Sequence, residues 1–106
     1  METLSAEHAV NTLAALAQPS RLAVFRLLVR AGPAGLAAGE IAERLDIPSA
    51  TLSFHLAQLS QAGLVAGRRA GRSIIYAADY RAMDGLIGYL TEKCCAGTGD
   101  RRALTG

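Results

Sequence analysis

The sequence predicts a mostly α-helical domain with one small β-hairpin, an α+β fold, from three observations. Apolar residues recur at helical spacing in five stretches, at about residues 7–17, 19–31, 38–45, 49–62 and 79–93. Only Asp46-Ile47-Pro48 separates the third and fourth stretches, and two helices joined by so short a break are typical of a helix-turn-helix motif. Residues 64–77 contain two β-type runs on either side of Ala70-Gly71-Arg72, which predicts a hairpin with a glycine turn.

Helix-breaking residues and apolar stripes support these helices. Pro19 fits the first turn of the second helix, where its missing N–H costs nothing, and Gly63 is expected to close the fourth helix in a left-handed conformation. The stripes expected to face the core or another subunit are Val10, Leu13, Ala14 and Ala17; Leu22, Phe25, Leu28 and Val29; Ile41 and Leu45; Leu52, Leu56 and Leu59; and Met83, Leu86, Ile87 and Leu90.

Length and composition restrict the class of protein. The chain has 106 residues, which indicates one domain over residues 1–106, and its apolar residues are so rich in alanine that a dimer is plausible. No apolar run approaches the ~18 residues that a transmembrane helix needs. Glu2 and Glu7 without a basic region do not resemble a secretory signal, and two adjacent cysteines cannot form a disulfide framework. We therefore expect a cytoplasmic protein that does not contact a membrane.

The basic residues are unevenly distributed along the chain. The formal net charge is +2, and residues 47–78 contain no Asp or Glu but include Arg68, Arg69 and Arg72. The positive excess therefore lies in the segment that contains the fourth helix and the hairpin. This segment suits a polyanion such as a nucleic-acid backbone, and the alternative is a solvated basic surface.

The start of the fourth helix displays short polar side chains of the kind that enter a DNA major groove. Alternatively, these serine and threonine residues only decorate an exposed helix, but the arginine-containing hairpin that follows favours DNA binding, because Arg72 at its turn could reach a phosphate or a minor groove. The expected DNA-contacting residues are Ser49, Ala50, Thr51, Ser53, Phe54, His55, Arg69 and Arg72.

Several short motifs occur in a specific order along the chain. They are Leu16-Ala17-Gln18-Pro19-Ser20-Arg21-Leu22, Glu40-Ile41-Ala42, Leu52-Ser53-Phe54-His55-Leu56, Ala62-Gly63-Leu64-Val65, Gly71-Arg72 and Tyr76. Together these motifs resemble the ArsR/SmtB family of metal-responsive repressors, and the resemblance extends from about residue 13 to residue 90. It implies a winged helix-turn-helix fold, with a recognition helix at about residues 49–62, a wing at about 64–77, and a homodimer formed by helices at about 7–17 and 79–93.

Cys94 and Cys95 are the candidate ligands for an inducer. They are adjacent, follow the last helix, and precede a glycine-containing tail, residues 96–106, that we expect to be flexible. Adjacent cysteines rarely form a disulfide with each other, but two thiolates can bind one soft, thiophilic centre. The alternative is that both are small hydrophobic residues with no ligand.

The identity of the inducer follows from the resemblance. The family's zinc-type site on the last helix uses Asp and His ligands, and the last helix here has no His; the family's Cys-Val-Cys site on the third helix is replaced by Ala37-Ala38-Gly39. The segment from Tyr89 to Cys95 instead resembles an arsenic-sensing branch whose cysteine pair follows the last helix. The third cysteine of some members is missing, which suits a trivalent organoarsenical such as methylarsenite. Arsenite or antimonite, with a third ligand from elsewhere, remains an alternative.

These observations predict an arsenic-responsive repressor that binds double-stranded operator DNA as a homodimer, uses no organic cofactor and is not an enzyme. One alternative keeps DNA binding but makes the cysteines sensors of oxidants or persulfides. Another is a winged-helix module that mediates only protein contacts. A small thiol-redox enzyme is disfavoured, because the cysteines follow a helix C-terminus, where the helix dipole opposes a thiolate.

Overall fold

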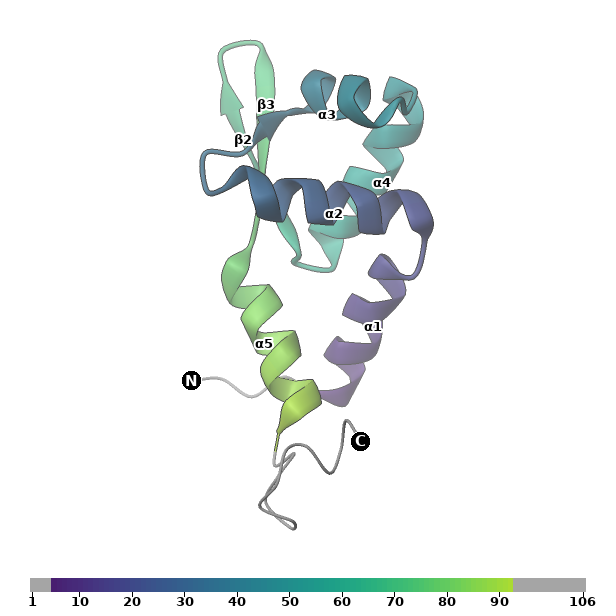
Figure 1. Ribbon diagram of the computed structural model, residues 1–106, viewed down its shortest axis with the longest axis vertical. Helices are drawn as coiled ribbons and strands as arrows, with labels where there is room; N and C mark the ends of the chain where they lie inside the picture. The colour runs from purple at the N-terminus through teal and green to yellow at the C-terminus, as the bar shows by residue number, and fades with distance from the viewer. Residues whose placement is uncertain (1–4, 93–106) are drawn as a thin grey trace.

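A computed structural model describes residues 5–92 and shows five helices and a three-stranded sheet within that range (Figure 1). Helices α1 and α5 contact each other at one end of the molecule, and the hairpin projects at the opposite end. The predicted helices and hairpin are therefore confirmed, with bounds that differ by one or two residues. In chain order the elements are α1 (Ala6–Leu16), α2 (Pro19–Ala31), β1 (Leu36–Ala37), α3 (Ala38–Leu45), α4 (Ser49–Gln61), β2 (Val65–Ala70), β3 (Ser73–Ala78) and α5 (Tyr80–Thr91).

The sheet contains a strand that the sequence did not predict. All pairs are antiparallel in the order β1-β3-β2, with Leu36 opposite Tyr76 and Val65 opposite Ala78. Strand β1 has only two residues, too few to show an alternating pattern. The chain enters it through Gly35, whose φ is +74°, and a Cβ at this position would collide with the backbone carbonyl of Tyr76. Glycine is therefore required for the close approach of β1 to β3.

Local interactions define the helix ends. Helix α2 begins at Pro19, as predicted, and the side chain of Gln18 accepts a hydrogen bond from the Arg21 backbone N–H at 2.8 Å. Gly63 follows α4 with φ +78°, which confirms the predicted left-handed cap. Asp79 caps α5 by accepting from the Ala82 N–H at 3.1 Å.

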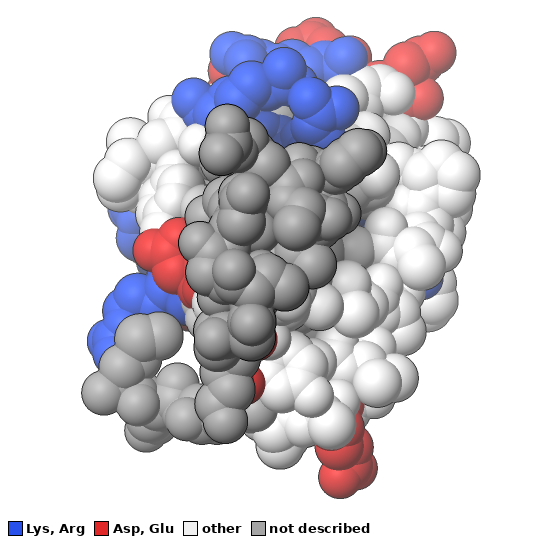
Figure 2. Space-filling view, turned by 60° about the horizontal axis from the view of Figure 1, so that its bottom comes forward, with Lys and Arg blue, Asp and Glu red and all other residues white. Residues whose placement is uncertain are grey.

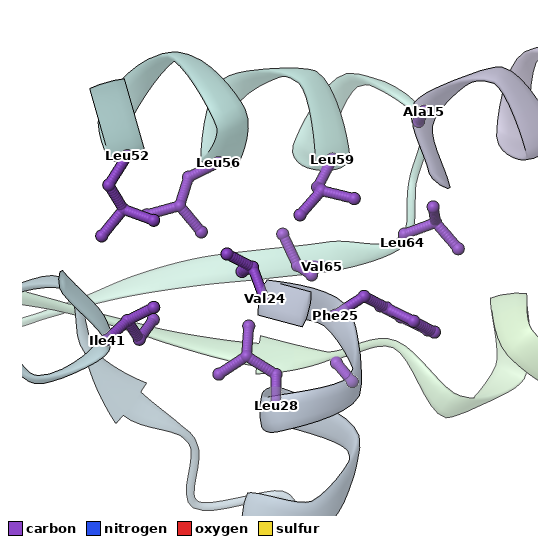
Figure 3. Packing of buried hydrophobic residues seen from close by; sticks show 11 residues of the cluster. Ala15, Val24, Phe25, Leu28, Ile41, Leu52, Leu56, Leu59, Leu64 and Val65 are labelled. Carbon is purple, nitrogen blue, oxygen red and sulfur yellow. The ribbon is translucent and has the colours of Figure 1, made fainter. Parts of the chain in front are cut away.

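The core lies between α4 and the layer formed by α2, α3 and the sheet (Figure 3). The three leucines of α4 point at Val24 and Leu28 of α2 and at Ile41 of α3. Tyr80 of α5 ties the last helix to this core by donating its hydroxyl hydrogen to the Val29 carbonyl at 2.9 Å. The large side chains with the least exposure are Val24, Leu28, Ile41, Leu52, Leu59 and Leu64.

Several predicted apolar stripes, which were expected to face the core or another subunit, leave large side chains exposed in the described part of the chain. On α1, Val10 and Leu13 are exposed, and the buried residues are Ala9, Thr12 and Ala15. Small residues face inward because α1 packs closely against its neighbours, so its larger side chains point outward. On α2, Leu22 is also exposed, and Val24 takes the buried position beside Phe25 and Leu28.

No single helix among residues 5–92 is long and apolar enough to cross a membrane. Helices α1 and α2 reach the required length and composition only together, and they are bent by 99° at the break between them.

Candidate nucleic-acid interface

Helices α3 and α4 form a helix-turn-helix unit whose turn is stabilised by backbone hydrogen bonds. Asp46 takes a left-handed conformation with φ 54°, and the Ile47 N–H donates to the Ala42 carbonyl at 3.0 Å. Leu52, Leu56 and Leu59 bury one side of α4 in the core, so the opposite side is presented to solvent. The core contacts therefore decide which face of α4 is available to a partner.

The exposed face of α4 contains five of the six residues of this helix that were expected to contact DNA. It combines hydroxyl groups with an aromatic ring, because Phe54 is 58% exposed. The first turn contains no acidic residue, and no side chain caps its backbone N–H groups, so the positive end of the helix dipole is open to an anion. The five exposed residues are Ser49, Ala50, Thr51, Ser53 and Phe54.

His55 does not share this face, and its position does not fit the expected contact with DNA. The side chain is 6% exposed, and its Nδ1 lies 3.3 Å from Nη1 of Arg21. Arginine only donates hydrogen bonds, so Nδ1 of His55 is the acceptor in this contact. His55 fails the expectation because it lies on the side of α4 that also holds Leu52, Leu56 and Leu59.

The β2–β3 hairpin presents its arginines at and near its tip. Gly71 and Arg72 form the turn, and Arg69 lies in β2 opposite Ile74, one pair from the turn. Both arginines are exposed. Arg68, which was not in the predicted set, donates instead from Nη2 to the Ala34 carbonyl at 3.2 Å, so it links the hairpin to the segment before β1.

Within residues 5–92, the wing arginines form no salt bridge. The ion pair in this part of the chain joins Arg44 and Glu40 on α3 at 2.8 Å. Because residues 47–78 contain no carboxylate side chain, the charges of Arg69 and Arg72 are not neutralised by neighbours in sequence. An exposed helix face next to a basic hairpin can bind the grooves and the phosphates of duplex DNA.

A second exposed surface, which we call the α1–α5 face, is apolar. It consists of exposed aliphatic side chains on both helices, while Leu86 of α5 is buried. Figure 2 brings this end of the molecule forward, and most of the visible surface of the described residues there has neither Lys and Arg nor Asp and Glu. An apolar face of this kind is typical of a protein–protein contact. Its residues are Val10, Leu13, Ile87 and Leu90.

Cys94 and Cys95, and the tail predicted at 96–106, lie outside the described residues. Among residues 5–92 there is no group of three or more His, Cys, Asp or Glu side chains that could hold a metal ion.

Residues 16–68 match a family described as "Helix-turn-helix domain", which includes α3 and α4. The chain is 41% identical over 76 residues to the HTH-type transcriptional regulator NmtR of Mycobacterium tuberculosis, covering 72% of this chain but less than two thirds (61%) of NmtR. It is 31% identical over 91 residues to the HTH-type transcriptional regulator YgaV of Escherichia coli, covering 86% of this chain and 90% of YgaV.

Three solved structures share the fold. An ArsR-like transcriptional regulator from Rhodococcus sp. RHA1 is 26% identical, with a TM-score of 0.73, and covers 93% of this chain and 90% of that one. A possible transcriptional regulator for arsenical resistance is 26% identical, with a TM-score of 0.67 and coverages of 76% and 80%. Reduced HlyU from Vibrio cholerae N16961 is 27% identical, with a TM-score of 0.63 and coverages of 83% and 88%.

Proposed function

We propose that this chain, which belongs to the ArsR/SmtB family of winged helix-turn-helix transcriptional regulators, is a dimeric repressor that a trivalent arsenical releases from operator DNA. The relatives are transcriptional regulators and not enzymes, as expected for this chain. The observation that carries the DNA-binding part of the proposal is the exposed face of α4 beside an acid-free, arginine-containing wing.

DNA binding is assigned to α4 and to the wing. The short side chains at the start of α4 allow the helix to approach base edges in the major groove, where Ser and Thr hydroxyls form hydrogen bonds. Phe54 supplies an apolar contact of the kind that recognises a thymine methyl group. Arg69 and Arg72 then reach phosphates or the adjacent minor groove and supply the salt-dependent part of the affinity.

The α1–α5 face is the proposed subunit contact. Val10 and Leu13 of α1 and Ile87 and Leu90 of α5 lie on two helices that touch each other, so they form one surface. A second copy of the chain covers this surface symmetrically, because the same patch serves both subunits of a two-fold dimer. The two recognition helices then face half-sites about one helical turn of DNA apart.

Cys94 and Cys95 are the proposed inducer site. A methylarsenite molecule, CH₃As(OH)₂, exchanges its two hydroxyl groups for two cysteine sulfurs and releases two waters, so arsenic stays trivalent and the cysteines are not oxidised. Two thiols match this requirement without a third protein ligand, whereas arsenite or antimonite would take a third ligand from elsewhere. The similarity to a possible transcriptional regulator for arsenical resistance supports this ligand class.

The position of the cysteines in the sequence suggests how binding is transmitted. The pair begins three residues after Thr91, the last residue of α5, and α5 forms half of the proposed subunit contact. Binding at this point can alter the packing of the two subunits and therefore the separation of the recognition helices. The inducer acts only if it binds the DNA-incompetent state more tightly, typically by ~1–3 kcal/mol.

A second candidate function keeps DNA binding and makes the cysteine pair a sensor of oxidants or persulfides. The observation that favours it is the similarity to reduced HlyU from Vibrio cholerae N16961. This alternative predicts release of DNA by an oxidant or persulfide in the absence of any arsenical.

The test is fluorescence anisotropy of reduced protein on DNA from upstream of its own gene. Methylarsenite, arsenite, antimonite, zinc and peroxide are titrated in parallel. We expect release by methylarsenite at lower concentration than by arsenite, and we expect the Cys94→Ser, Cys95→Ser double variant to bind DNA normally but not to respond. Release of the double variant by an arsenical would refute the site. Release by peroxide but not by arsenicals would establish the redox alternative.

A further inference from the structure

A polar pocket of about 420 Å³ lies where α1, α2 and the C-terminal end of α4 meet. Asn11 of α1, Arg21 of α2, and Gln58 and Gln61 of α4 line it, and alanine side chains form the rest of its wall. The lining therefore contains one cation and three carboxamides and no acidic residue. Its volume lies within the range of ~300–1,000 Å³ that is typical of small-molecule sites.

Arg21 is only partly satisfied by the protein around it. Its Nε donates to the Ala15 carbonyl at 2.7 Å, and its Nη1 contacts Nδ1 of His55 at 3.3 Å. Neither partner is a carboxylate, and within residues 5–92 Arg21 forms no salt bridge. A guanidinium group has five N–H donors, so donors remain for a ligand in the pocket. A planar carboxylate matches this fork geometry best, because it can accept two parallel hydrogen bonds.

The three carboxamides define the rest of the ligand. Each side-chain amide of Asn11, Gln58 and Gln61 can both donate and accept a hydrogen bond. They therefore suit a small molecule that has hydroxyl or amide groups in addition to its carboxylate. The alanine walls add little polarity and leave room for a short carbon chain.

The contacts of Arg21 connect this pocket to the proposed DNA-binding surface. Through Ala15 the guanidinium holds the last turn of α1, and through His55 it holds α4 from its buried side. The contact with His55 is longer than the usual ~2.9–3.0 Å of an N–H hydrogen bond, so a carboxylate can compete for Nη1. Loss of this contact removes the side-chain hydrogen bond that links Arg21 of α2 to His55 of α4.

We propose that this pocket is an effector site for a small organic carboxylate, separate from Cys94 and Cys95, and that its occupation lowers the affinity of α4 for DNA. The effect on DNA rests on the proposed repressor function, whereas binding in the pocket does not. The two parts are therefore measured separately.

Binding is tested by NMR titration of the ¹⁵N-labelled chain with malate, lactate and benzoate. The corresponding amides and inorganic phosphate are added in parallel at the same ionic strength. We expect the side-chain amide signals of Asn11, Gln58 and Gln61 to shift with at least one carboxylate and not with its amide. Absence of such shifts with all three carboxylates at millimolar concentrations overturns the site. Equal shifts with phosphate or with the amides overturn the assignment to carboxylates.

A matched pair of variants tests the role of the pocket. Gln58→Glu places a negative charge beside Arg21 and should weaken carboxylate binding about tenfold or more. Ser60→Glu adds the same charge to α4 at an exposed residue outside the pocket, and it should leave carboxylate binding unchanged. Equal weakening by both variants overturns the location of the site.

The effect on DNA is measured by anisotropy with the wild-type chain and a carboxylate that binds. We expect saturation to weaken DNA binding by about fivefold or more, as in a typical allosteric coupling, and we expect the matching amide to have no effect. Carboxylate binding without any change in DNA affinity overturns the coupling. If the chain does not bind DNA at all, the repressor function fails, and the NMR titration still decides whether the pocket binds a carboxylate.

Discussion

Replacing Leu90 by alanine tests the α1–α5 face as the subunit contact. The substitution removes three carbon atoms, each contributing about 0.8 kcal/mol when it is taken fully out of water. The three carbon atoms together would contribute about 2.4 kcal/mol. Leu90 is 58% exposed in one subunit, so a partner that covers it fully gains about 1.4 kcal/mol of these 2.4 kcal/mol. A symmetric dimer contains the residue twice, which gives a loss of about 2.8 kcal/mol, or an increase of about 100-fold in the dimer Kd.

The dimer Kd is measured by sedimentation equilibrium without DNA or inducer. The control is Ile74→Ala on β3, which removes a comparable aliphatic side chain that is 38% exposed but lies in the hairpin at the other end of the molecule (Figure 1). The control should leave the dimer Kd unchanged. The reasoning is refuted if Leu90→Ala dimerises as tightly as the wild type, or if both variants weaken the dimer equally.

Four other substitutions, one of them with a matched control, test the remaining features. Leu59→Ala, at a fully buried site of α4, should lower the free energy of unfolding by about 2–5 kcal/mol in urea titrations; a loss below 1 kcal/mol would contradict the packing. Gly35→Ala should lower the free energy of unfolding by more than about 2 kcal/mol, because the new Cβ meets the Tyr76 carbonyl. The control Gly32→Ala also has a positive φ but meets open space, so it should lower the free energy of unfolding by only about 1–2 kcal/mol in the same assay. Equal losses for the two variants would argue against the close approach of Gly35 to Tyr76. Tyr80→Phe removes the hydrogen bond to Val29 and should cost about 1 kcal/mol of unfolding free energy, and an unchanged midpoint would show that the bond adds nothing. Arg72→Gln should reduce the slope of log K against log salt by about 2 for a dimer, measured by anisotropy at several salt concentrations; an unchanged slope would remove Arg72 from the phosphate contacts.

Much of the fold could be predicted because its signals are local. Helix α3 and the start of α4 lie where apolar spacing and the Asp46-Ile47-Pro48 break place them. Gly63 adopts its left-handed conformation because the helix must end there. The hairpin around Gly71 was recognisable from two β-type runs of sufficient length.

Parts of the candidate interface could not be predicted, because they depend on contacts between distant segments. His55 has the sequence neighbours of a DNA-contacting residue, but the packing of α4 against α2 places it beside Arg21, 34 positions earlier in the chain. Helix α1 contains both a small-residue side and an aliphatic side. Periodicity alone did not indicate that Ala9, Thr12 and Ala15 would face inward.

The sequence by itself determined the order and ends of the helices, the hairpin, the absence of acidic residues around the wing, and the presence of two adjacent thiols. These properties depend on backbone preferences, charge and chemistry that act over a few residues. Only the tertiary structure decided that Leu36 pairs with Tyr76, that Val10 and Leu90 are exposed on touching helices, and that Arg21 lines a pocket. Periodicity identifies an apolar side of a helix, but close packing against segments far away in the chain decides which side is buried.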